Sequence, residues 1–357
     1  MPSKTSADRM PRTRRGNRPG SLVWWRFVTA TLAAAGLMSA APASSADFYQ
    51  GKTINLVIGY SVGGGYDLYA RVLGKYLGKH IPGNPTVVPQ NMVGAGSLRA
   101  ANYLYSVAAK DGTVIGNFSR SVAIAPLISS AQFDARTFSW LGSITKDVSI
   151  CITWNTSSIK SWDDMMSRQF VAGGEGAGSD PDIFALMYKN VFGAKVKLVS
   201  GYPGTNDITL AMERGEVDGL CGISWSTIKS RHADWIKGHK INIPVQAALQ
   251  KDPDLPDVPI ATDLAKGEEQ TQILKLLLAT QVLARPFAAP PGMPADRKAI
   301  LRKAFDDTMN DPEFRAEASK LRLDVNPISG SSIDALLKEI YETPKAVVAK
   351  AAKAIAE

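Results

Sequence analysis

Two short turns are rich in glycine, and each joins an apolar run to an amphipathic pattern. Their residue types could form a binding site. In the first, the β-branched run 55–58 leads to three glycines at 63–65, and helical apolar spacing starts at Asp67. The second, FVAGGEGAGSDPD (170–182), has the same order, with Ser179 suited to cap a helix. Glycine lets backbone N–H groups face a ligand, and a helix N-terminus favours an anion. The pair predicts an anion site; the alternative is tight turns that need positive φ.

The first 46 residues are typical of a secretory signal peptide. They carry +6 of the formal net charge of +8, which leaves +2 for residues 47–357 and argues against nucleic-acid binding. A basic segment precedes the apolar run 27–40, which is too short to span a bilayer. Small residues then precede a cleavage site that we place after Ala46. We therefore expect a mature protein in the periplasm.

Strand-like runs alternate with helical patterns along the exported chain, which indicates α/β sheets with helices on both faces. Two such series, at about 47–140 and 145–275, indicate two domains. Ligands of open α/β sheets bind beyond the carboxyl ends of the strands, so we expect glycine loops from both domains to face one cleft. Cys151 and Cys221 fit either a disulfide or two buried free thiols.

The order of the motifs resembles the periplasmic solute-binding receptors of tripartite tricarboxylate transporters, the Bug family. The matching segments are GGGYD (63–67), GAGSLRAANYLYSVAAKDGTVIGN (94–117), GGEGAGSDPD (173–182), GYPGTND (201–207), GEVDG (215–219), LPDVPIATDLAKG (255–267) and PFAAPPGMPADR (286–297). The resemblance implies a two-domain periplasmic binding protein of the Venus-flytrap type II class, with parallel-dominated sheets. It places domain 1 at 47–144 plus 278–357, and domain 2 at 145–277.

The same resemblance implies a ligand and the loops that hold it. Receptors of this family bind a small organic carboxylate and deliver it to integral membrane transporter subunits. The positions that carry over are Ser61, Gly63, Gly64, Gly65, Tyr66, Asp67, Ser119, Gly174, Glu175, Gly176, Ala177, Gly178, Ser179, Tyr202, Gly204 and Thr205. We expect a monomer with no cofactor and no metal. An exported sensor that feeds a membrane kinase would share all these features.

Several residues depart from the family pattern or add to it. Tyr66 stands where a small residue is usual, and Pro203 replaces the usual lysine. Glu175 joins the small residues of the second loop and could meet an ammonium group or face water. Arg120 could hold a second carboxylate with its forked guanidinium, or be a solvated loop residue. Trp225 could line the cleft or pack in a core.

An enzyme is the rival class. Residues 59–63, GYSVG, match the nucleophile-elbow pattern with Ser61 as nucleophile, and three histidines follow it in the chain. A hydrolase elbow, however, follows several strands, whereas about a dozen exported residues precede this one. The dinucleotide pattern G-x-G-x-x-G fails because Leu68 occupies its last position. The histidines and cysteines are scattered and show no metal-ligand spacing. Binding without turnover is the better prediction.

Overall fold

The computed structural model describes residues 48–356, so the expected signal peptide and its cleavage site lie outside the described part. The strands of this part form two sheets, with the orders β11-β4-β10-β3-β1-β2 and β7-β6-β8-β5-β9. The first sheet contains β1 (Thr53–Ile58), β2 (Thr86–Asn91), β3 (Val114–Asn117), β4 (Ser139–Ser143), β10 (Pro286–Ala289) and β11 (Ile328–Ser329). The second contains β5 (Ser149–Trp154), β6 (Phe170–Gly173), β7 (Val196–Val199), β8 (Gly219–Ser224) and β9 (Ile241–Ala247).

Each sheet combines parallel and antiparallel pairs. In the first sheet β1 runs parallel to β2 and β3, whereas β10 runs antiparallel to β3 and β4. In the second sheet β6 runs parallel to β7 and β8, whereas β5 runs antiparallel to β8 and β9. The sheets contain more antiparallel strand pairs than the parallel-dominated sheets that we expected from the sequence. The chain enters β5 and β10 from the other sheet, so neither strand is reached through the helical crossover that makes neighbouring strands parallel.

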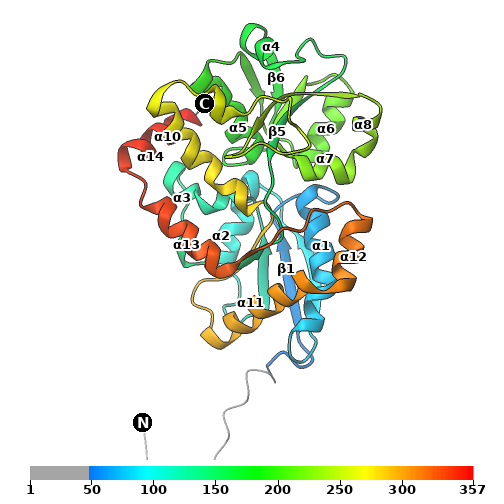
Figure 1. Ribbon diagram of the computed structural model, residues 1–357. Coiled ribbons are helices and arrows are strands. Elements are labelled where there is room, and N and C mark those ends of the chain that lie inside the picture. Colours follow the sequence, from blue (N-terminus) through cyan, green and yellow to red (C-terminus); the bar gives the residue numbers. More distant parts are fainter. Residues whose placement is uncertain (1–47, 357) are drawn as a thin grey trace, which may run out of the picture. The chain divides into compact units, whose positions relative to one another are not determined.

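Helices lie on both faces of each sheet (Figure 1). They are α1 (Gly65–Leu77), α2 (Leu98–Ser106), α3 (Ala125–Ile128), α4 (Trp162–Ser167), α5 (Asp180–Phe192), α6 (Thr205–Glu213), α7 (Trp225–Arg231), α8 (Ala233–Lys237), α9 (Ala261–Leu264), α10 (Gly267–Leu278), α11 (Ala295–Asn310), α12 (Pro312–Lys320), α13 (Gly330–Tyr341) and α14 (Lys345–Ala354). Short 3₁₀ turns occupy Gly78–His80, Ala95–Ser97, Arg120–Ala123, Ala135–Thr137 and Ala279–Leu283. Within residues 48–356, no helix combines the length and apolar character needed to cross a bilayer.

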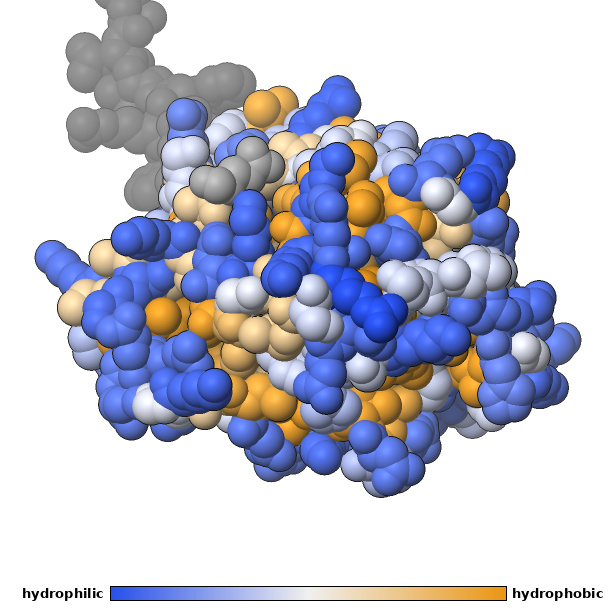
Figure 2. Space-filling view, turned by 90° about the horizontal axis from the view of Figure 1, so that it is seen from above, coloured by the Kyte–Doolittle hydropathy of each residue, from blue (hydrophilic) through white to orange (hydrophobic). Residues whose placement is uncertain are grey.

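Successive strand residues bury opposite faces, which explains the continuous apolar runs in the sequence. Leu56 packs in the cluster under α1 and α11, whereas Val57 packs in the cluster on the other face with α2 and α13. In the second sheet Cys151 packs with α5 and α10, whereas Ile152 packs with α6 and α7. The face seen in Figure 2 is mostly hydrophilic, with small groups of apolar residues between the polar ones. Each sheet is therefore buried on both sides by its own helices.

The C-terminal segment contacts elements of both sheets. Helices α11 and α13 pack against β4, whereas α14 packs against α10 and α5. Ala351 and Ala354 of α14 share a buried cluster with Met187 of α5. Helix α14 also packs against α3, and the domain limits at residues 144 and 278 stay a prediction.

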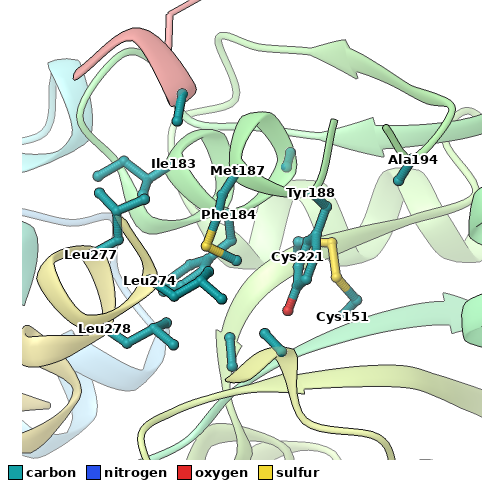
Figure 3. Close-up of a cluster of buried hydrophobic side chains, with 14 of the residues drawn as sticks. Cys151, Ile183, Phe184, Met187, Tyr188, Ala194, Cys221, Leu274, Leu277 and Leu278 are labelled. Carbon is teal, nitrogen blue, oxygen red and sulfur yellow. A yellow bond between two sulfur atoms is a disulfide. The ribbon is translucent and has the colours of Figure 1, made fainter. Parts of the chain in front are cut away.

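The two cysteines form a disulfide in the core of the second sheet. Cys151 of β5 and Cys221 of β8 are bonded, and both are fully buried. Figure 3 shows the bond beside Tyr188 and Phe184 of α5, with Leu274 of α10 nearby. Of the two alternatives that the sequence left open, the structure contains the disulfide.

Candidate ligand-binding site

The first glycine turn is held by the aspartate in the first turn of its helix. Asp67 is the third residue of α1, and its Oδ2 accepts the Gly63 N–H at 2.9 Å. Its Oδ1 accepts hydrogen bonds from Arg71 Nε at 2.9 Å and Asn91 Nδ2 at 2.8 Å. Burial opposes ionisation, but these hydrogen bonds outweigh it and lower the pKa of Asp67 below its usual value. Asp67 therefore fixes the shape of the turn.

The second turn is also held by an aspartate in the first turn of its helix. Asp182 is the third residue of α5, and its carboxylate accepts the Gly176 N–H at 3.0 Å and the Ser200 hydroxyl at 2.6 Å. Ser179 caps the helix by accepting the Asp182 N–H at 3.3 Å. In both turns a glycine N–H thus donates to a carboxylate of the chain itself. Some of the glycine N–H groups that we expected to be free for a ligand are therefore already bonded to carboxylates of this chain.

Arg120 follows β3 and is buried, with 1% of its surface exposed. Its Nε donates to Asp180 Oδ2 at 2.8 Å, and its Nη2 donates to Ser149 Oγ at 2.8 Å. Asp180 begins α5 and Ser149 begins β5, so this side chain links the loop after β3 to the second sheet. Its Nη1 has no hydrogen-bond partner. The structure thus excludes the alternative that Arg120 is a solvated loop residue.

Arg285 precedes β10 and is equally buried. Its Nη1 donates to Ser224 Oγ at 3.1 Å and its Nη2 to Thr227 Oγ1 at 3.0 Å, while Asp147 Oδ2 lies 3.6 Å from Nη2. The guanidinium carbon lies 4.7 Å from the ring centre of Tyr66, a cation–π distance. The Nε has no partner. Arg285 thus offers a second buried N–H donor.

Both arginines line one small cavity of about 20 Å³, which is room for about one water molecule. Its other lining residues are Tyr60, Gly65, Tyr66, Glu175, Asp180, Pro181, Thr205, Gly222, Ile223, Ser224 and Thr227. A second cavity of about 150 Å³ shares Tyr60 and Glu175 with the first, and Tyr202 also lines it. Glu175 is thus the acidic side chain that lines both cavities.

Glu175 is 7% exposed and has one satisfied oxygen. Its Oε1 accepts the Thr205 hydroxyl at 2.7 Å, whereas Oε2 has no partner. Burial, with a smaller contribution from the nearby Asp180, Asp182 and Asp207 carboxylates, raises the pKa of Glu175 to about 8, although the hydrogen bond from Thr205 opposes the shift. At neutral pH the Glu175 carboxyl is therefore largely protonated.

Tyr66 lines the small cavity. Its ring stacks on Tyr60 with centres 4.5 Å apart, and its hydroxyl accepts the backbone N–H of Arg120 at 3.1 Å. Arg285 contacts the same ring. Tyr66 thus contacts both arginines.

The predicted site residues divide into two groups. Gly65, Tyr66, Arg120, Glu175 and Thr205 line the small cavity, and Tyr202 and Glu175 line the second. The residues that line neither of these cavities are Ser61, Gly63, Gly64, Asp67, Ser119, Gly174, Gly176, Ala177, Gly178, Ser179, Gly204 and Trp225. Most of this second group shapes the loops around the cavities.

Two members of that second group show different roles. Ser119 is buried, and its hydroxyl bonds to Asp180 Oδ1 at 3.2 Å, next to the Arg120–Asp180 pair. Trp225 is 5% exposed and packs in the apolar cluster of β5, α6 and α7, with its Nε1 donating to Asp254. Of the two sequence interpretations of Trp225, the packing one fits this position.

Close approach is tightest at Gly65 among the three glycines of the first turn, although a Cβ on Gly63 would also lie 2.8 Å from Asn206 Nδ2. A Cβ on Gly65 would lie 2.3 Å from Thr227 Oγ1, which belongs to α7 beside the second sheet. A Cβ on Gly64 would lie 3.8 Å from its nearest neighbour, Ser61 O, which is ordinary contact. Of the glycines predicted for this turn, Gly65 lines the small cavity.

Sequence reasoning missed Arg285, Asp180 and Tyr60. Arg285 had a usable signal, because it is the one charged residue in the apolar run 276–289. A buried charge needs partners, so a single arginine in such a run indicates a polar site. Asp180 had a weaker signal as the acidic residue directly after the capping Ser179.

The geometry gives little support to a hydrolase. Ser61 lies against Gly204, and within residues 48–356 no hydrogen bond joins it to a histidine. His80 pairs with Asp311 at 2.8 Å, and His232 stacks on Trp235 with ring centres 3.8 Å apart. In the same part of the chain, no group of three acidic, histidine or cysteine side chains could hold a metal ion. The lining of the small cavity suits binding by charge and hydrogen bonds.

Comparison with known proteins supports this fold. No family model matches the chain. The protein named "UPF0065 protein in gbd 5'region" from Cupriavidus necator is 22% identical over 332 residues, covering 90% of this chain and 94% of that protein. The periplasmic binding protein BugD superposes with a TM-score of 0.67 at 19% identity, over 85% of this chain and 97% of BugD. MatC from Rhodopseudomonas palustris with bound malate gives 0.65 at 18% identity, over 85% and 99%.

These likenesses confirm the predicted fold class, the α/β fold of periplasmic binding proteins, with helices on both faces of two sheets. They also confirm the resemblance to Bug-type receptors that the motif order indicated.

Proposed function

We propose that this chain is a solute-binding protein of the Bug type that captures a small organic carboxylate between its two sheets. One observation carries the proposal: Arg120 Nη1 and Arg285 Nε are buried donors without partners, and both arginines line the same cavity. A buried donor left unpaired costs about 1–3 kcal/mol. A carboxylate oxygen is the acceptor that guanidinium groups match best.

Binding requires the two sheets to move apart. The small cavity cannot admit an organic acid at about 20 Å³, so the described state is a closed one. In this state Asp180 supplies the carboxylate for Arg120, and the Ser121 hydroxyl donates to Gly178 O at 2.7 Å. We propose domains at 47–144 plus 278–357 and at 145–277, which close on the ligand and stay monomeric.

Export and delivery complete the proposal. The relatives include a periplasmic binding protein by name, and MatC was solved with malate, which supports a periplasmic carboxylate receptor here. The signal peptide would direct export, and integral membrane subunits of a tripartite tricarboxylate transporter would receive the ligand. No catalytic step is part of this function.

A thermal-shift screen of organic acids against residues 47–357 tests the proposal. An acid at one hundred times its dissociation constant should stabilise the protein by about 2.7 kcal/mol. The bound acid should be recovered chemically unchanged. If no carboxylate stabilises the protein, or if a product of the acid appears, the proposed function is wrong.

A further inference from the structure

A groove of about 710 Å³ lies on the surface, away from the small cavity, and we call it the basic groove. One wall comes from α7 and α8, and the other from α12 and the turn that follows it. Helices α7 and α8 pack in the core of the second sheet, whereas α12 packs in the core of the first. The basic groove shares no lining residue with the small cavity. It is therefore a separate feature, built by helices of both sheets.

Positive charge dominates the lining of the basic groove. Its basic residues are Lys229, Lys237, Arg315 and Arg322, and its one acidic residue is Asp324. Lys229 already pairs with Asp324 at 3.0 Å, across the groove. Within residues 48–356, no carboxylate forms an ion pair with Lys237, Arg315 or Arg322, and these residues are exposed. Their charges are therefore available to a partner from outside the chain.

The acidic residues of the same helices pair elsewhere. Glu313 and Glu317 of α12, four residues apart, face α1 and pair with its lysines. Arg315 and Ser319, also four residues apart, share the face that lines the groove. Asp234 of α8 pairs with a lysine outside the groove. This separation of charge leaves both walls basic.

Two of the arginines occupy positions that local structure does not favour. Arg315 lies in the first turn of α12, near the positive end of the helix, where a cation is disfavoured. Its Nε donates to Met309 O at 2.7 Å, which holds the side chain beside the groove. Arg322 has φ of 58° in the turn that ends α12, a left-handed position where glycine is favoured. Helix formation and capping therefore do not explain these residues, whereas a binding role for their charge does.

The shape and the apolar part of the groove indicate the kind of partner. Ile236 of α8 is 38% exposed, and the buried residues Ala318 and Leu323 also line the groove. A protein segment with acidic and apolar side chains would match both parts of this lining. A bilayer surface is flat and would not follow a groove between helices, so a protein segment fits these charges better.

We infer that the basic groove binds an acidic segment of a partner protein. The carboxylates of the segment contact Lys237, Arg315 and Arg322, and its apolar side chains pack on Ile236 and Leu323. A groove of this size suits a transient contact, and exposed charge pairs make such a contact sensitive to salt. This docking surface is additional to the proposed carboxylate site and does not depend on it.

Selection from a library of random peptides tests the inference, with residues 47–357 as the immobilised target. We expect the selected peptides to be richer in aspartate and glutamate than the unselected library. Fluorescence anisotropy then measures their affinity for a groove variant that combines Lys237→Gln, Arg315→Gln and Arg322→Asn. Asparagine tolerates positive φ, so the turn at residue 322 should be kept. We expect the groove variant to bind the acidic peptides about tenfold more weakly or worse.

A charge-matched control changes three exposed lysines of the C-terminal helices. It combines Lys338→Gln, Lys345→Gln and Lys353→Gln, and it should bind the peptides like wild type. Added NaCl should weaken binding to wild type more than binding to the groove variant. The single charge reversal Lys237→Glu gives a second measurement that leaves the turn after α12 untouched, and it should also weaken binding.

Three results would overturn the inference and leave the proposed function standing. The first is a set of selected peptides with no acidic enrichment. The second is an acidic peptide that binds the groove variant and Lys237→Glu as tightly as the control. The third is sedimentation with phosphatidylglycerol vesicles that depends on the groove residues when no acidic peptide is selected, which would assign the groove to a membrane surface.

Discussion

Arg120, Arg285 and Glu175 each bury an ionisable group that keeps one polar atom without a partner. Buried ion pairs such as Arg120–Asp180 contribute little net stability, because desolvation offsets most of their attraction. Their presence in one cavity therefore fits a role in binding better than a role in folding. The unpaired atoms mark where a ligand would complete the network.

Glu175 should make stability depend on pH. Its pKa is raised from 4.5 to about 8 in the folded protein, mainly by burial, so the folded chain holds a proton that the unfolded chain releases between these values. The free energy of unfolding should fall as pH rises from about 5 to about 8, by up to about 1.4 kcal/mol per pH unit. Glu175→Gln cannot ionise and should lose this part of the slope.

Urea unfolding at pH 5.5 and pH 7.5 measures this slope. The control Glu216→Gln should keep the wild-type slope, because that side chain is exposed. If wild type and Glu175→Gln lose stability equally between the two pH values, Glu175 is not held protonated in the folded state.

At the scale of elements, the two strand–glycine–helix units share one construction. Asp67 in α1 and Asp182 in α5 each accept a glycine N–H from the preceding turn. Each carboxylate also lies near the positive end of its own helix. This internal bond orders the turn before any ligand arrives, and it brings Gly65 and Glu175 to the cavity wall.

A pair of glycine variants separates close approach from turn geometry. Gly65→Ala places a Cβ 2.3 Å from Thr227 Oγ1, so we expect closure to be hindered and carboxylate affinity to fall at least tenfold, about 1.4 kcal/mol. Gly64→Ala meets no neighbour closer than 3.8 Å and should bind like wild type. Adding Thr227→Ala to Gly65→Ala should restore part of the affinity. Equal binding by both single variants would contradict the close approach.

The disulfide should stabilise the second sheet through the 70-residue separation that it closes between Cys151 and Cys221. Replacing both cysteines by alanine should lower the free energy of unfolding by roughly 2–5 kcal/mol. Because both sulfurs are buried, the native protein should resist alkylation after mild reduction. Urea unfolding of the double variant checks the first expectation, and an unchanged midpoint would refute it.

Local elements could be predicted because their signals are local. The helical spacing after residue 67 and the cap at Ser179 lie within a few residues of the turns they specify. The antiparallel placement of β5 and β10 was less predictable, because it depends on where the chain passes between the sheets. For the same reason the packing of α14 against α3, α5 and α10 could not be predicted from local signals.

At the scale of the whole molecule, the site exists only after folding. Its lining residues Gly65, Arg120, Glu175 and Arg285 are spread over more than half of the chain. The sequence predicted the first three from a turn, a strand end and a loop. It could not place Arg285 beside them, because that neighbourhood comes from the return of the chain into β10.

The closed state is held by contacts that a ligand would have to exchange or supplement. Asp180 occupies Arg120, and Ser121 bonds to Gly178. The proposed opening would expose two buried arginines and Glu175 to water, and closure around a carboxylate would return them to a completed network. Affinity should thus depend on the same arginines that link the two sheets.

Calorimetric titration of an arginine pair tests the central claim most directly, using the organic acid with the largest thermal shift. Arg285→Lys keeps the charge near Asp147 but loses the forked donor, whereas Arg136→Lys makes the same change at an exposed position paired with Asp134. We predict that Arg285→Lys folds and binds the acid at least tenfold more weakly, and that Arg136→Lys binds like wild type. A folded Arg285→Lys protein with wild-type affinity would contradict carboxylate capture by the buried arginines.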